Sequence, residues 1–235
     1  MGRLLLLLWF SLLLIPEVFA HVSSDSTVKR IFPKLTKQIG LKEPNLEADE
    51  YEVLIWYRQG LRFGDAQAVY VLHKTEKLFT VVKYIIDSNQ RGFQSAKRWK
   101  PTVTTTLALW QRLLKQNILT LPNESTVFDR LYPKSRPSPP VDTVQTGMQA
   151  DGSFTVKGYR TERRRSLFTD GDSYSFELFG PNNYRVYSYS NPDAYLRDEP
   201  KCEELQNVVG ILNDLNLLFR SDKLGKEQAK AINKD

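Results

Sequence analysis

The stretch "DSYSFELFGPNNYRVYSYSNP", residues 172–192, decides the fold because it combines an alternating apolar pattern with one strong turn. Tyr174, Phe176 and Leu178 alternate with two serines and a glutamate, which is the two-residue period of a strand. Residues 180–183 read Gly-Pro-Asn-Asn, and these residue types favour a tight turn. The stretch therefore predicts a β-hairpin with one face in a core.

The return strand of this hairpin carries a row of large polar and aromatic residues. Its alternation places Tyr184 and Val186 on one face, with the apolar side chains of the first strand, and Arg185, Tyr187 and Tyr189 on the other. An exposed row of this kind can stack sugars or lipids while its hydroxyls stay in water. We predict that Arg185, Tyr187 and Tyr189 bind a ligand. The alternative is that the tyrosines fill the core.

The chain after the hairpin predicts one helix and a tail. Residues 200–219 have acids in the first turn, where the helix dipole favours them. An apolar stripe follows at helical spacing, formed by Leu205, Val208, Val209, Leu212 and Leu215. Residues 220–235 are polar, and we expect them to fray.

The first half of the chain predicts a second hairpin and helix. Residues 51–60, "YEVLIWYRQG", are apolar on both faces, which indicates a central strand. Residues 66–87 form two apolar runs around a polar turn, and residues 88–100 read as a polar loop with a bend at Gly92. Residues 102–117 carry an amphipathic helix, whose threonines at 104–106 offer capping hydroxyls.

The N-terminal residues 24–40 have apolar residues at helical spacing with lysines between them. We interpret this segment as a helix packed across the sheet with its lysines in water. A helix lying on a membrane is the alternative.

Residues 132–152 are rich in proline and read as an irregular loop. Because each flank has too few strands to close a core alone, we predict one domain over 21–219. The fold class is α+β: an antiparallel sheet built from two hairpin-plus-helix halves, 66–117 and 173–219, with helices packed on it.

Residues 1–20 have the pattern of a signal peptide. Arg3 precedes the apolar run 4–15, and Val18 and Ala20 are small residues where a signal peptidase reads the chain. We expect cleavage after Ala20, a secreted or periplasmic protein, and no stable membrane span after cleavage. An uncleaved anchor is the alternative.

Composition restricts the chemistry. The net charge of +6 and the pI near 9.3 are compatible with anionic surfaces, while export disfavours nucleic acid as a partner. Cys202 is the one cysteine, which we expect to be buried rather than in an intermolecular disulfide. With only His21 and His73, the sequence lacks the ligands of an ordinary zinc site, and we expect no metal and no cofactor.

Three weaker patterns remain open. A free His21 amine and imidazole with His73 would suit copper. The arginines within 160–165 would bind phosphate or protect a strand edge. Four acids in or beside strands would serve glycoside hydrolysis, or lie in water as surface acids: Glu52, Asp170, Asp172 and Glu177.

The order of elements over residues 51–219, with "DGDSYSFELFGPNNYRVYSYSNP" before a leucine-rich helix, resembles a loose group of exported bacterial proteins of unknown function. The resemblance implies export and an α+β fold, and it carries no activity. We predict an exported binding or envelope-accessory protein of unknown ligand, or alternatively a carboxylate-dependent hydrolase acting on an extracytoplasmic substrate.

Overall fold

The structure is a computed structural model that describes residues 30–133, 145–148, 151, 153–157, 171–181, 183–221 and 223–234. The predictions for the signal peptide, His21, Asp170, the arginines of 160–165 and most of the proline-rich segment fall outside the described residues.

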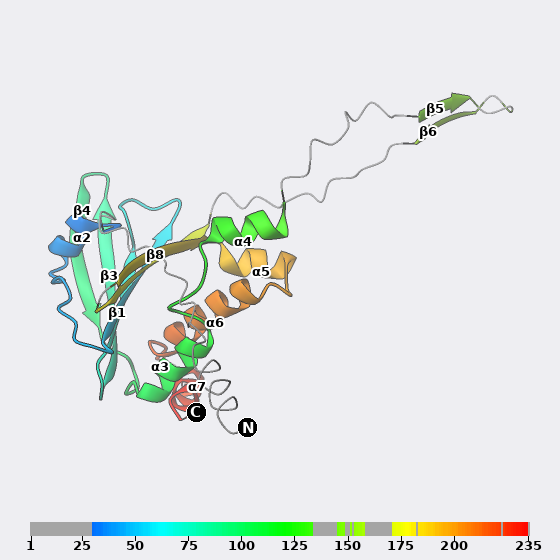
Figure 1. Cartoon of the computed structure of the whole chain (residues 1–235). Coiled ribbons are helices and arrows are strands. Elements are labelled where there is room, and N and C mark those ends of the chain that lie inside the picture. Colours follow the sequence, from blue (N-terminus) through cyan, green and yellow to red (C-terminus); the bar gives the residue numbers. More distant parts are fainter. Residues whose placement is uncertain are drawn as a thin grey trace, which may run out of the picture.

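A six-stranded antiparallel sheet forms the centre of the fold, in the order β4-β3-β2-β1-β7-β8 (Figure 1). Its strands are β1 (Tyr51–Gln59), β2 (Ala68–Lys74), β3 (Phe79–Asn89), β4 (Gly92–Trp99), β7 (Asp172–Gly180) and β8 (Asn183–Ser190). With helices packed around this sheet, the α+β prediction is confirmed.

Strand β1 joins the two halves of the sequence. It pairs with β2 on one side and with β7 on the other, so strands from before and after the proline-rich segment share one sheet. Its residues 53–56 are buried on both faces of the sheet, as the sequence predicted. The loss of apolar surface from water on both faces makes this strand the centre of the core.

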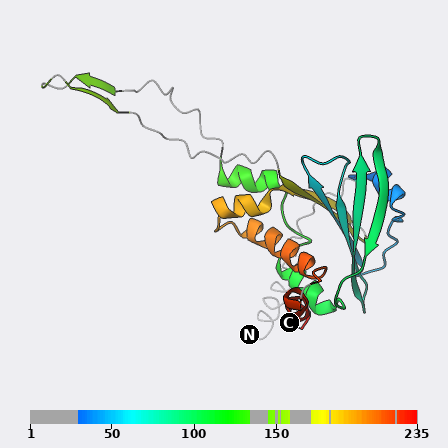
Figure 2. The same ribbon diagram turned by 180° about the vertical axis from the view of Figure 1, so that it is seen from behind.

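Helices cover the two faces of the sheet unequally (Figures 1 and 2). The short helix α2 (Pro33–Gln38) packs on one face over a small core that includes Leu35, Leu54 and Trp56. The other face carries the larger core, which is shared with five helices. They are α3 (Leu107–Lys115), α4 (Glu124–Leu131), α5 (Pro192–Asp198), α6 (Glu203–Leu217) and α7 (Lys223–Ile232).

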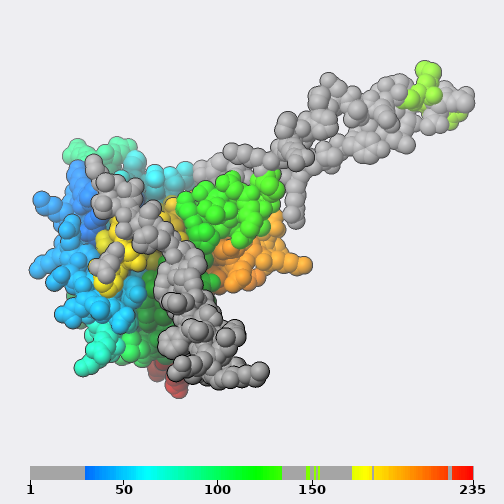
Figure 3. Space-filling view, in the orientation of Figure 1, coloured from blue at the N-terminus to red at the C-terminus, as the bar shows by residue number. Residues whose placement is uncertain are grey.

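The space-filling view separates these regions (Figure 3). The segment that contains α2 lies at one side of the molecule, and α4 and α5 lie at the other. Within the part of the chain that the structure describes, no helix is long and apolar enough to cross a membrane.

The hairpin β7–β8 forms where the sequence predicted it, but the face assignment of its return strand was wrong. The turn pairs Gly180 with Asn183, so Phe176 lies opposite Tyr187 and Glu177 lies opposite Val186. Directly opposed residues point to the same face of a sheet. Tyr187 therefore belongs to the larger core, and Val186 faces the side of α2.

Residues 88–100 were predicted as a polar loop and instead continue the sheet. Strand β4 pairs with the second half of β3, after a turn at Gly92 with a φ of 105°. Most β4 side chains are exposed because it is an edge strand. The apolar alternation that marks a half-buried strand is therefore weak in this segment.

The polar C-terminal tail was predicted to fray, and this was wrong. Helix α7 buries Ala229 and Ile232 in the larger core. Beyond its end, Asn233 accepts bonds from the Thr106 backbone N–H at 3.2 Å and the Thr106 hydroxyl at 3.1 Å. Thr106 is the N-cap of α3, so its hydroxyl holds the tail instead of capping its own helix.

Four further elements of the described chain escaped prediction. Helices α4 and α5 are short, and each has few residues from which to read a period. Strands β5 (Gln145–Met148) and β6 (Phe154–Lys157) form a separate two-stranded sheet. The first of these strands lies in the segment 132–152 that was predicted to be irregular.

Candidate functional site

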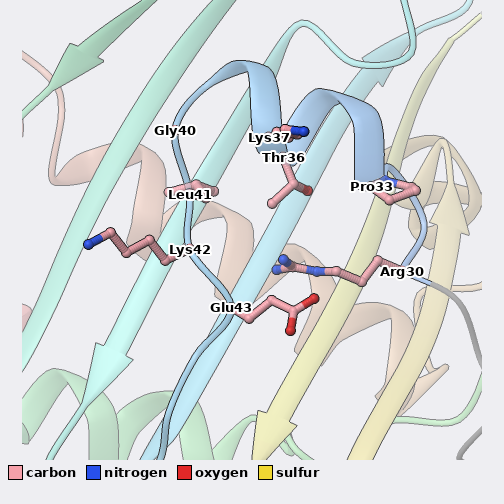
Figure 4. Close-up of a pocket in the computed structure, with 8 residues that line it drawn as sticks. All are labelled: Arg30, Pro33, Thr36, Lys37, Gly40, Leu41, Lys42 and Glu43. Carbon is pink, nitrogen blue, oxygen red and sulfur yellow. The ribbon is translucent and has the colours of Figure 1, made fainter.

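A pocket of about 420 Å³ lies between α2 and the segment that follows it (Figure 4). Its volume is in the range that accommodates a small molecule. The lining combines basic, polar and apolar side chains: Arg30, Pro33, Thr36, Lys37, Gly40, Leu41, Lys42 and Glu43.

Local sequence explains how this pocket forms. Pro33 opens α2, a position where its missing N–H costs nothing. Gly40 ends the helical segment with a φ of 76°, a conformation that glycine adopts freely. The chain then turns back, and the Leu41 N–H donates to the Thr36 carbonyl at 3.0 Å. Residues 40–43 consequently form the wall opposite the helix.

A buried carboxylate fixes the start of this segment to the sheet. Glu177 is fully buried on the α2 side of β7. It accepts bonds from the Ile31 backbone N–H at 2.8 Å, the Trp56 indole at 2.7 Å and the Tyr184 hydroxyl at 2.7 Å. Three donors compensate much of the cost of taking a charge out of water. Because Ile31 is held, the neighbouring Arg30 is held beside the pocket.

Arg30 is the chemically informative residue of the lining. Its guanidinium lies 4.9 Å from the centre of the Phe179 ring, which is a cation–π contact. Its Nε and Nη2 atoms are buried and have no hydrogen-bond partner. A buried charged donor without a partner is costly, and native structures seldom leave one unsatisfied. An acceptor that reached the guanidinium from the pocket would satisfy these donors.

The charges around Arg30 favour an anion. Lys37 and Lys42 bring two more cations to the lining, and Glu43 brings one carboxylate. Below the pocket, burial raises the pKa of Glu52, while the neighbouring His73 and Arg30 act in the opposite direction. The His73 Nδ1 lies 3.7 Å from the Glu52 carboxylate.

The predicted binding row does not form an exposed surface. Tyr187 and Tyr189 are 1% and 0% exposed, and Arg185 is half-buried. All three point at the connection between α3 and α4. The Tyr187 hydroxyl donates to the Ile118 carbonyl at 2.7 Å.

The other two members of the row make equivalent contacts. The Tyr189 hydroxyl donates to the Pro122 carbonyl at 2.7 Å, and Arg185 donates to the carbonyls of Leu119 and Leu121. A connection without regular structure leaves its carbonyls unpaired, and burial demands partners for them. The prediction of an exposed row is corrected: these three side chains hold the connection against the sheet.

The other residues predicted from the sequence are dispersed. Asp172 accepts a bond from the Tyr57 hydroxyl at 2.8 Å, and Glu177 is saturated within the small core. Cys202 is buried without a disulfide, and burial raises the pKa of its thiol. Among the described residues, no group of histidine, cysteine and acidic side chains is arranged to hold a metal ion.

Sequence reasoning missed the pocket because it treated the basic residues of 24–40 as a solvated helix face. Lys34 and Lys37 lie on the same short helix, but only Lys37 lines the pocket. The glycine at 40 was the available signal, since it reverses the chain and brings Lys42 back toward the helix.

Comparison with known proteins gives no relative. No family model, no curated protein and no solved structure matches this chain. Function is therefore inferred from the chemistry of the site.

Proposed function

We propose that this protein is an exported binding protein that takes a small anionic molecule in the pocket beneath α2. The observation that carries the proposal is the pair of buried, unpartnered donors on Arg30 at a pocket with two lysines. A guanidinium presents parallel N–H groups that match a phosphate or carboxylate. The apolar lining from Pro33 and Leu41 suits an organic ligand.

Export is supported by the N-terminal sequence. Arg3, the apolar run 4–15 and Ala20 follow the pattern of a cleaved signal peptide. We place the protein outside the cytoplasm, secreted or periplasmic, where its net charge of +6 favours anionic ligands.

Binding is favoured over turnover by the positions of the acids. Each described acid of the hydrolase hypothesis has its own partner in the protein. Glu52 faces His73, and Asp172 accepts a hydrogen bond from Tyr57. Both carboxylate oxygens of Glu177 accept hydrogen bonds. A glycosidase requires two carboxyl groups free to act on one bond. The pocket residues instead offer donors for an anion.

Calorimetric titration of the mature protein tests this proposal. The probes are inorganic phosphate, phosphoserine and succinate, and we expect saturable one-site binding of at least one of them. Arg30→Gln should weaken that binding roughly tenfold to hundredfold, the value of a charge-assisted bond of about 1.5–3 kcal/mol. Lys34→Gln is the matched control, because Lys34 is an exposed lysine on α2 outside the lining, and it should bind normally.

The stability of the variant separates a ligand-binding arginine from a structural one. Since its Nε and Nη2 have no hydrogen-bond partner to lose, Arg30→Gln should cost only the cation–π contact with Phe179, about 0.5–1 kcal/mol. A large loss of stability with unchanged affinity would assign Arg30 to the fold and contradict the proposal. Absence of binding for all three probes at millimolar concentration would do the same.

A further inference from the structure

The two edges of the six-stranded sheet are treated differently. At one edge, the chain covers β8 with its own side chains: Asn123 accepts from the Ser188 N–H at 3.0 Å, and Glu124 accepts from the Ser190 N–H at 2.8 Å. Such cover removes the unpaired backbone groups that would attract another strand. Edge β8 is closed.

The opposite edge is β4, and it pairs only with β3 in the described part of the chain. In Figure 2 the β3–β4 hairpin lies on the side of the sheet away from α4 and α5. Near its N-terminal end, the Gln94 amide donates to the carbonyls of Gly92 and Phe93. Within the described ranges, only β3 pairs with the rest of the strand, toward Trp99.

The charge of this hairpin is strongly biased. Residues 83–100 contain five basic residues and one acid, a local net charge of +4 out of +6 for the whole chain. The side chains of Lys97, Arg98 and Lys100 are exposed. Positive charge at an edge prevents pairing with an identical edge, because like charges oppose one another. The same charge attracts an acidic strand.

Apolar anchors accompany the charge. Trp99 is 43% exposed and Ile85 is 36% exposed, which is high for such side chains. The register pairs Trp99 with Lys83 and Ile85 with Lys97, so all four lie on one face of the hairpin. The Lys97 ammonium lies 5.9 Å from the centre of the Trp99 ring. Exposed aromatic and basic residues together are the anchors that protein interfaces use.

We propose that β4 is a docking edge for an extended acidic segment of a partner protein, which adds to the sheet as a further strand. Backbone pairing along β4 supplies affinity, and acidic side chains facing the exposed Lys97 and Arg98 supply selection. A second copy of this chain is disfavoured by its own positive edge. An anionic lipid surface would satisfy the charges and leave the backbone unpaired.

This proposal needs neither the ligand of the α2 pocket nor Arg30. Fluorescence anisotropy with labelled peptides of about ten residues, the length of a long strand, provides the test. One peptide alternates glutamate with valine and tyrosine. A second has lysine in place of glutamate. A third repeats the acidic sequence with alternate backbone nitrogens methylated, which blocks pairing and keeps the charge.

We expect the acidic peptide to bind, and the lysine and N-methylated peptides to bind at least tenfold more weakly. Lys97→Glu combined with Arg98→Glu should abolish binding of the acidic peptide. The control combines Lys201→Glu with Lys226→Glu, two exposed lysines on other elements, and should retain it.

Two results would overturn the inference. Equal affinity for the acidic and N-methylated peptides would show attraction by charge alone. Binding to vesicles of phosphatidylglycerol without binding to the acidic peptide would assign the basic hairpin to a lipid surface.

Discussion

Alkaline pH is expected to unfold this protein over a narrow range above pH 10. Burial raises the pKa of the three most buried titrating tyrosines, Tyr70, Tyr187 and Tyr189, above the ordinary value of 10.0. Each hydroxyl donates to a protein oxygen, on Asn216, Ile118 and Pro122 respectively. An ionised phenolate of Tyr187 or Tyr189 would lose that bond and oppose the carbonyl oxygen, so ionisation there favours unfolding. The Tyr70 oxygen also accepts from the Lys83 ammonium at 2.7 Å, and burial is what raises its pKa.

The direction and size of the effect follow from proton linkage. Because the folded-state pKa lies above the unfolded value, the stability from these tyrosines is fully present below pH 10 and is lost as the pH rises through the folded values. Each retained proton contributes a slope of about 1.4 kcal/mol per pH unit, so three give roughly 4 kcal/mol per unit. Burial also lowers the pKa of Lys83, which opposes this loss with a single group.

Circular dichroism and tyrosinate absorbance recorded together during an alkaline titration test this expectation. Both signals should change in one cooperative step, since a protein of ordinary stability lasts only about one to three pH units against such a slope. A double variant, Tyr187→Phe with Tyr189→Phe, should have a slope lower by about 2.7 kcal/mol per unit. Gradual ionisation of all tyrosines near pH 10, with the folded spectrum retained, would refute the buried positions.

Replacement of Tyr187 by alanine is expected to have the largest effect of any single change discussed. The ring is fully buried and stacks on Phe176, with 4.5 Å between centroids and an interplanar angle of 16°. Its removal leaves a cavity in the larger core and an unpaired Ile118 carbonyl. Losses of about 3–5 kcal/mol are typical for such truncations. Such a loss is a large fraction of the roughly 5–15 kcal/mol by which an ordinary domain is stable, so it should be obvious as a lower unfolding midpoint.

Urea unfolding curves of three variants make this prediction specific. Tyr187→Phe keeps the ring and should cost only about 1–3 kcal/mol for the unsatisfied carbonyl. Trp99→Ala truncates an exposed aromatic and should change stability by about 0.5 kcal/mol or less. If Tyr187→Ala were as mild as Trp99→Ala, the row would be a surface feature after all.

The sequence predicted every strand of the six-stranded sheet except β4, and it did not predict which face each side of the β7–β8 hairpin occupies. Within residues 51–60, positions 53–56 are all apolar, so their burial on both faces of the sheet follows directly. The hairpin at 172–190 was equally clear, but the pairing of Gly180 with Asn183 decides which faces coincide. With a two-residue turn, odd residues of the return strand oppose even residues of the first. The prediction of an exposed binding row came from assigning Tyr187 and Tyr189 to the face opposite the core.

Tertiary contacts explain the remaining differences. The polarity of the tail predicts fraying, yet two apolar residues, Ala229 and Ile232, are enough to bury α7 once Asn233 bonds to Thr106. The pocket depends on Glu177, which is more than a hundred residues away from the Ile31 that it holds. No local pattern encodes such a contact. Arg30 therefore gave no sign of its role in the sequence.

The direct test of the anion site is nuclear magnetic resonance titration of the mature protein with inorganic phosphate. We predict saturable shifts of the Arg30 Nε–H signal and of the Thr36 and Leu41 backbone amides, with little change along β4, and loss of these shifts in Arg30→Gln. Unmoved Arg30 and Leu41 signals at millimolar phosphate, or shifts centred on Lys97 and Arg98, would contradict an anion site beneath α2.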